Sequence, residues 1–161
     1  MRIRNGRDTI DTYRLDGAPA YLLRRCLQRV SDLFAEEIGS KGITLRQFMV
    51  LLAIHQRPGL SQTDLVAATG IDRSTIGEMV ERLSRRGLIE RRRSGRDQRS
   101  NDLLLLPAGR RALAAAMPAA ARAQARLLGP LPAKLRTAFL LGLRHIADLN
   151  LPRPLARGHG G

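Results

Sequence analysis

Residues 85–99 concentrate positive charge in a pattern suited to binding an anionic polymer. The stretch holds seven arginines against two acids, Glu90 and Asp97. Guanidinium groups at this density are suited to pairing with the phosphates of a nucleic acid backbone. The formal net charge of the whole chain, +14, points to the same kind of partner. The arginines are Arg85, Arg86, Arg91, Arg92, Arg93, Arg96 and Arg99.

Directly upstream, a helix beginning at Asp72 is predicted to carry a small polar face. Ile76, Val80 and Leu83 recur at i, i+4 and i+7 and give this helix one buried stripe. The opposite face holds short hydroxyl side chains and guanidinium groups, which can hydrogen-bond to base edges in a DNA groove. That face comprises Arg73, Ser74, Thr75, Gly77, Glu78 and Arg82.

The helix from Asp72 is the second of a closely spaced pair. Ser61, with Asp64 three residues later, resembles a capping box for the first helix, and Gly70 supplies the permissive backbone that a sharp exit needs. Asp72 is a good N-cap for the second helix, which ends at Gly87. Two helices joined by a short turn containing glycine form a helix-turn-helix, whose second helix enters the major groove of DNA.

The arginine-rich segment reads as a β-hairpin that follows this pair. Residues 88–93 and 100–106 are predicted to be strands around a Ser94-Gly95 turn. A helical hairpin inside an ordinary core is the alternative explanation of the two helices. The basic ribbon favours instead a winged helix-turn-helix that binds DNA.

These residues resemble the MarR-type winged-helix transcriptional regulators. The wing signature of that family is Asp, one residue, Arg, five residues, then Leu-Thr-Pro-x-Gly. Its places are taken here by Asp97, Arg99, Leu105, Pro107 and Gly109, with Leu106 where threonine is usual. This departure removes a good N-cap from the next helix, although Pro107 still suits a first helical turn. The resemblance extends upstream to Thr44-Leu45-Arg46-Gln47-Phe48 and covers roughly residues 18 to 149.

Amphipathic patterns on both sides of the winged unit predict further helices. One runs from Thr44 to about His55, and one spans residues 107–128, where Pro118 should cause a kink. The first long helix, from Ala18 to about Gly39, has an apolar stripe of Leu23, Cys26, Leu27, Val30, Leu33, Phe34 and Ile38. The last helix, from about Pro132 to Leu149, is expected to bury Leu135, Phe139, Gly142, Ile146 and Leu149.

The predicted fold is mainly α with a small β-wing: a winged helix-turn-helix flanked by N- and C-terminal dimerisation helices. On residues alone, the flanking helices could equally meet a second copy or fold back on the winged domain; the resemblance implies the dimer. A symmetric dimer would bind an imperfect palindrome. The expected divisions are a flexible N-terminal arm (1–17), an N-terminal dimerisation helix (18–43), the winged DNA-binding domain (44–107), C-terminal dimerisation helices (108–149) and a flexible tail (150–161).

The expected contacts to double-stranded DNA lie on the second helix and the wing. Arg73 and Arg82 are best suited to carry sequence preference, because arginine can pair bidentately with guanine. In the wing, Arg96 or Arg99 can enter a narrow minor groove with Asp97 orienting one of them, or Asp97 can simply stabilise the turn. Solvated surface is the alternative for all of these. The full set of expected DNA contacts is Arg73, Ser74, Thr75, Arg82, Arg86, Arg91, Arg96 and Arg99.

The resemblance also implies a repressor released by a small anionic or phenolic aromatic ligand, with an aromatic acid or its CoA thioester as candidates. Arg24 and Arg25 could pair a carboxylate. Solvated or salt-bridged arginines, core packing for Phe48 and Met117, and a helix-end role for His55 are the competing explanations. The candidate ligand contacts are therefore Arg24, Arg25, Phe48, His55 and Met117.

Two alternative functions stay open at this stage. Cys26 would allow redox sensing if oxidants can reach it, because Arg25 and Arg29 could lower the pKa of its thiol. A cysteine within the apolar stripe of a helix is, however, usually a small core residue. The second alternative is an architectural protein that binds DNA without sequence preference. The sequence offers no metal-ligand spacing, cofactor motif or catalytic constellation, so an enzyme is not expected. The single cysteine and the lack of an apolar signal or membrane segment lead us to expect a cytoplasmic protein.

Overall fold

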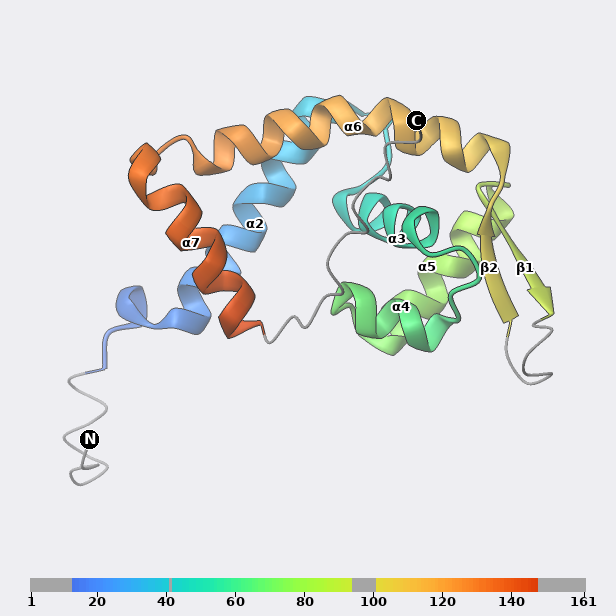
Figure 1. Cartoon of the computed structure of the whole chain (residues 1–161), viewed down its shortest axis with the longest axis horizontal. Coiled ribbons are helices and arrows are strands. Elements are labelled where there is room, and N and C mark those ends of the chain that lie inside the picture. The colour runs from blue at the N-terminus through green and yellow to red at the C-terminus, as the bar shows by residue number, and fades with distance from the viewer. Residues whose placement is uncertain (1–12, 41, 94–100, 148–161) are drawn as a thin grey trace, which may run out of the picture. The chain divides into compact units, whose positions relative to one another are not determined.

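A computed structural model describes residues 13–40, 42–93 and 101–147 (Figure 1). It confirms a mainly helical chain with a small antiparallel sheet. The chain divides between residues 127 and 128 into two units, of which the first contains the winged domain. The elements of the first unit are η1 (Leu15–Gly17), α2 (Pro19–Ile38), α3 (Leu45–Gln56), α4 (Gln62–Thr69), α5 (Arg73–Arg85), β1 (Ile89–Arg93), β2 (Asn101–Leu105) and α6 (Pro107–Leu128, whose last residue begins the second unit).

Local hydrogen bonds set the helix starts where the sequence predicts them. Thr44 and Gln47 form a reciprocal capping box at α3, and Ser61 and Asp64 form one at α4. Each box satisfies backbone N–H groups that the first helical turn leaves without partners. Asp72 caps α5 by accepting a 2.9 Å hydrogen bond from the backbone N–H of Thr75.

Two glycines with left-handed backbone end the helices of the pair. Gly70 follows α4 with φ +67°, and Gly87 follows α5 with the same value. At the second end, the N–H of Gly87 donates to the carbonyl of Ser84 (2.9 Å) and the N–H of Leu88 to that of Leu83 (3.0 Å). The tight turn and the exit into the ribbon therefore both use a conformation that favours glycine.

The ribbon is attached to the helix-turn-helix by backbone pairing. β1 and β2 are antiparallel, with Ile89 opposite Leu105 and Arg93 opposite Asn101. Leu103 of β2 exchanges hydrogen bonds with the segment before α4, donating to the carbonyl of Leu60 (2.9 Å) and accepting from the N–H of Gly59 (3.1 Å). The base of the ribbon is thus fixed relative to α4.

One hydrophobic cluster joins the elements of the first unit. Leu51 and Ile54 of α3, Leu65 of α4, and Leu83 of α5 are among its fully buried side chains. The predicted stripe of α5 is confirmed, since Ile76, Val80 and Leu83 are all buried. Alanines of α6 complete the cluster: Ala116, Ala120 and Ala123. Because alanine is short, α6 can lie close against the elements that it covers.

Helix α6 runs without interruption through Pro118 (Figure 1). Its C-terminal half is joined to α2 by ion pairs: Arg122 and Arg126 bind Glu37, and Arg126 also binds Glu36. The Arg126–Glu36 and Arg126–Glu37 pairs measure 2.8 and 2.9 Å. These contacts connect the C-terminal end of α2 to the C-terminal half of α6.

The expected burial of the α2 stripe is only half correct. Leu33 and Phe34, near its C-terminal end, are buried, but Leu23, Cys26 and Leu27 are exposed in the single chain. Leu22 and Leu27 are 47% and 57% exposed. The prediction that Cys26 is a small core residue is therefore wrong for the isolated chain, because the core reaches only the last turns of α2.

Helix α7 (Ala133–Ile146), in the second unit, buries none of its side chains. The expectation that the last helix buries its apolar residues is therefore wrong for a single chain: Leu135 is 46% exposed and Ile146 is 73% exposed. Leu149 lies outside the described residues. An amphipathic helix with its apolar side uncovered exposes apolar surface to water, which is unfavourable.

Within the predicted flexible N-terminal arm (1–17), Leu15–Gly17 forms a 3-10 turn. An ion pair of 3.0 Å between Arg14 and Asp16 stabilises this turn. Residues 1–12 of the predicted arm and the predicted tail, 150–161, lie outside the described residues.

Candidate nucleic-acid interface

Helix α5 presents the polar face that the sequence predicts. Arg73, Ser74 and Arg82 are exposed, and Thr75 is partly buried. Arg86 is exposed as the C-cap residue of the same helix. Because the apolar stripe fixes the rotation of α5, these side chains stand on the part of its surface that is available to a partner.

Asp72 fixes one of these side chains and one backbone N–H group at the helix start. Its Oδ1 accepts hydrogen bonds from the Ser74 hydroxyl (2.6 Å) and from the Thr75 backbone N–H (2.9 Å). These bonds, led by the one from Ser74, hold the pKa of Asp72 far below its usual range. Asp72 therefore stays ionised at neutral pH and orients Ser74 next to Arg73.

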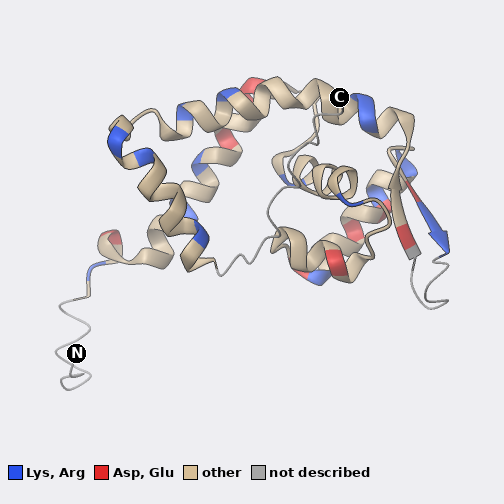
Figure 2. Ribbon diagram, viewed as in Figure 1, with Lys and Arg blue, Asp and Glu red and all other residues tan. Residues whose placement is uncertain are grey.

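The ribbon adds a second basic surface beside α5. Figure 2 shows the arginines gathered on β1, where Arg91, Arg92 and Arg93 are all exposed. Arg92 is paired with Glu90 on the same strand at 2.6 Å. The remaining predicted wing residues, Arg96, Asp97 and Arg99, lie outside the described residues, so their roles stay predictions.

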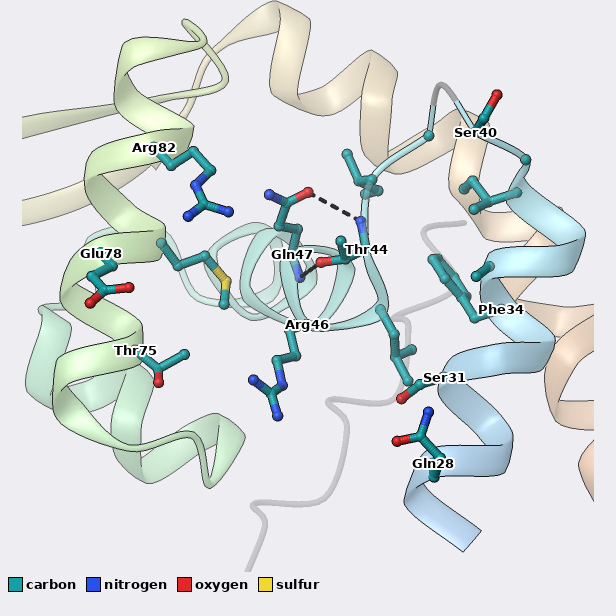
Figure 3. Close-up of a pocket in the computed structure, with 17 residues that line it drawn as sticks. Gln28, Ser31, Phe34, Ser40, Thr44, Arg46, Gln47, Thr75, Glu78 and Arg82 are labelled. Atoms are coloured by element: carbon teal, nitrogen blue, oxygen red, sulfur yellow. Dashed lines mark hydrogen bonds between the residues drawn. The ribbon is translucent and has the colours of Figure 1, made fainter. Parts of the chain in front are cut away.

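A pocket of about 990 Å³ opens between α2, α3 and α5 (Figure 3). Phe34, Ile38, Ile43, Leu45 and Met79 give it apolar walls. Arg46 enters from α3, and α5 contributes Thr75, Glu78 and Arg82. Gln28 and Ser31 line the α2 side, and Gln47 is held near the centre by its capping box. Apolar walls with a few polar and charged groups are typical of sites for small organic ligands.

The predicted ligand contacts do not line this pocket. Arg24 and Arg25 are exposed on α2, and Met117 is 47% exposed on α6, so it is not a core residue in the single chain. Phe48 is buried, and the centroid of its ring lies 5.5 Å from that of Phe34, which does line the pocket. His55 lines a smaller cavity of about 320 Å³ at the ribbon base. Ligand contact by these five residues stays a prediction.

Sequence reasoning missed Arg46, Glu78 and Gln28 as pocket residues. Arg46 stands in the first turn of α3, inside the Thr44–Phe48 segment that carries part of the family resemblance. Its place beside a capping box was visible in the sequence. That Arg46 shares a pocket with residues of α5 was not visible, because this depends on how α4 packs against both α3 and α5.

No group of His, Cys, Asp and Glu side chains among the described residues could hold a metal ion. In the same part of the chain, no helix combines the length and the apolar composition needed to cross a bilayer.

A tight pair of helices, a basic two-stranded ribbon and long flanking helices define a winged helix-turn-helix protein of the DNA-binding class. The model of the MarR family matches residues 41–100. The HTH-type transcriptional repressor NicR of Pseudomonas putida is 33% identical over 128 residues, which are 80% of this chain and 81% of NicR. The chain belongs to the MarR family, and its relatives are transcriptional regulators.

Solved structures extend the similarity to the whole fold. BpsR of Bordetella bronchiseptica, whose DNA binding is regulated by 6-hydroxynicotinic acid, is 31% identical with a TM-score of 0.78, over 84% of this chain and 98% of that chain. The repressor CouR is 34% identical in two structures. Bound to a 23-mer DNA duplex it has a TM-score of 0.73, over 91% of this chain and 99% of that chain. Bound to p-coumaroyl-CoA it has a TM-score of 0.74, over 84% and 95%.

Proposed function

We propose that this chain is a homodimeric repressor that binds a palindromic operator and is released by a small anionic aromatic ligand. The observation that carries the DNA-binding part is the exposure of Arg73, Ser74 and Arg82 on the second helix of the tight pair. The exposed arginines of β1 lie next in the chain. In this arrangement α5 occupies the major groove, while the ribbon holds the flanking phosphates.

The uncovered apolar side chains support a dimer. Leu22, Leu23 and Leu27 are exposed along α2, and four large apolar side chains are exposed along α7: Leu135, Leu140, Leu141 and Ile146. Leaving this much apolar surface in water is unfavourable, and a second copy supplies a matching surface by symmetry. Two copies related by a two-fold axis place their α5 helices on half-sites about 34 Å apart, one turn of DNA.

The pocket between α2, α3 and α5 supports a ligand that combines an aromatic ring with one negative charge. Phe34, Ile38 and Met79 favour an apolar ring, while Arg46 and Arg82 favour a carboxylate or a phosphate. BpsR responds to an aromatic acid and CouR binds an aromatic CoA thioester. We extend this class of ligand to the present chain.

Selection of duplexes from a random library, followed by fluorescence anisotropy, tests the proposal. We expect one palindrome to be bound at least about 1000-fold more tightly than a scrambled duplex at the same salt concentration. Arg73→Ala should reduce that preference, whereas Arg14→Ala, directly before η1 and outside the winged unit, should leave it unchanged. Light scattering should give the mass of a dimer.

Addition of 6-hydroxynicotinic acid or p-coumaroyl-CoA tests the response to ligand. We expect at least one of them to weaken operator binding. Equal affinity for palindrome and scrambled duplex would support an architectural protein and contradict specific regulation. A monomer at micromolar concentration would contradict the dimer.

A further inference from the structure

One flank of α5 belongs to both the DNA-reading surface and the pocket. Thr75, Glu78 and Arg82 follow at i, i+3 and i+7, so their side chains stand in a row along the helix. Figure 3 shows Thr75 and Arg82 extending from α5 toward α3, and Arg46 extending from α3; with Glu78 they line the same pocket. Arg82 is also exposed, and Ser74 lies on the adjoining surface of α5.

The charges around this space leave room for one anion. Arg46 and Arg82 are its two described cations, and Glu78 is its one described acid. Neither guanidinium has a carboxylate of the described residues within 4.0 Å. A monoanionic ligand would thus neutralise the remaining positive charge, and a guanidinium binds a carboxylate most strongly with two parallel hydrogen bonds.

We propose that Arg82 is a shared residue: the ligand's anionic group binds Arg82 together with Arg46 and thereby withdraws Arg82 from DNA. This inference rests on the proposed function and specifies how the ligand acts. A guanidinium that forms a bidentate pair with the ligand cannot use the same N–H groups on a guanine or a phosphate. Release then arises from competition for one side chain on α5, and it does not require a change in the spacing of the two reading helices.

Arg46 provides the matched control, because it lines the same pocket from α3 but does not lie on the recognition helix. Binding of ligand and of DNA must affect each other by the same factor. We define the coupling factor as the Kd for the selected duplex at saturating ligand divided by the Kd without ligand. Removing a residue that only holds the ligand lowers ligand affinity and leaves this factor unchanged. Removing the shared residue lowers the factor itself.

The test measures the coupling factor by anisotropy for the wild type, Arg46→Gln and Arg82→Gln, with 6-hydroxynicotinic acid and p-coumaroyl-CoA as probes. Circular dichroism checks that each full-length variant is folded. We expect Arg46→Gln to keep the wild-type DNA affinity and coupling factor while binding the probe about tenfold more weakly. We expect Arg82→Gln to lose about tenfold in DNA affinity and to reduce the coupling factor about tenfold.

A neutral analogue isolates the role of charge. At saturation, 6-hydroxynicotinamide should leave the DNA affinity of the wild type within twofold, because an amide does not pair with Arg82 as a carboxylate does. A wild-type coupling factor in Arg82→Gln, or wild-type DNA affinity in that variant, overturns the inference and leaves the proposed function standing. If neither acidic probe changes the DNA affinity of the wild type, the ligand response of the proposed function fails, and this inference fails with it.

Discussion

The Ser74 hydroxyl donates a 2.6 Å hydrogen bond to Oδ1 of Asp72, the same oxygen that caps the backbone N–H of Thr75. One carboxylate thus begins the recognition helix and orients a side chain that we expect to contact DNA. Stability of the helix and order of the DNA-reading surface are coupled at this residue.

Asp72→Ala should therefore lower both Tm and operator affinity, whereas Asp72→Asn should retain much of both because asparagine is also a good N-cap. The pKa of Asp72 is lowered in the folded chain, so its contribution is present at neutral pH and is lost as pH falls through that lowered pKa. Thermal unfolding of the three proteins at pH 7 checks the stabilisation, and a series continued to below pH 2 checks its loss. A Tm of Asp72→Ala equal to that of the wild type at pH 7 would contradict it.

Gly109, in the first turn of α6, has no room for a side chain. A β-carbon there would collide with the Leu88 carbonyl oxygen, which also accepts the N–H of Leu106 at 3.0 Å. Helix propensity alone would make Gly109→Ala stabilising by about 1 kcal/mol. We expect it to be destabilising by about 1–3 kcal/mol, because the α6 start must move away from the end of α5. The sign of the change in urea unfolding distinguishes the two effects.

Arg73 and Arg91 should contribute to DNA binding in different ways. Arg91, exposed on β1, is expected to contact phosphate, so Arg91→Gln should reduce the slope of log K against log salt by about 0.9 and weaken all duplexes alike. Arg73, at the α5 start, is expected to contact a base, so Arg73→Gln should cost about 1–3 kcal/mol on the selected duplex only. Anisotropy titrations at four salt concentrations check both. Identical effects on selected and scrambled duplexes in the two variants would contradict this division.

The winged unit could be predicted from the sequence because local interactions determine it. Capping side chains at Thr44, Ser61 and Asp72 and the glycines at 70 and 87 lie within a few residues of the backbone groups that they satisfy. The MarR signature adds a second, independent indication of the ribbon. Helix existence and strand pairing were therefore visible without coordinates.

The pocket between α2, α3 and α5 and the burial of the flanking helices could not be predicted in the same way. Arg46 and Arg82 line one pocket because α4 packs against both α3 and α5, and residue spacing does not encode this arrangement. Sequence reasoning chose Arg24 and Arg25, which are exposed on α2. An apolar stripe shows that a helix has something to cover. It does not show whether the covering surface belongs to the same chain.

The ion pairs of Glu37 with Arg122 and Arg126 should stabilise the contact between α2 and α6. Both arginines hold the pKa of Glu37 below its usual range, with Arg122 the larger influence. Glu37→Gln should lower Tm at pH 7, and the difference from the wild type should shrink as pH falls through the lowered pKa of Glu37 or as salt is added. Glu36→Gln, which removes only one contact with Arg126, should have a smaller effect. Equal Tm values for all three proteins at low salt would contradict a stabilising role.

Cys26 offers an internal probe of the proposed dimer. Its thiol is exposed in the single chain and shares a face of α2 with Leu22 and Leu23, four and three residues away. If a second copy covers this face, the thiol of the native protein should react with a chromogenic disulfide at least about tenfold more slowly than in a dissociated chain, because opening must precede reaction. Leu27→Glu places a charge within the same surface and should produce a monomer whose thiol reacts rapidly. Fast labelling of the wild type, together with a dimer mass by light scattering, would show that the dimer interface does not include this part of α2.

The wild type treated with hydrogen peroxide should keep its operator affinity. A loss of affinity that Cys26→Ser prevents would support the redox-sensing alternative.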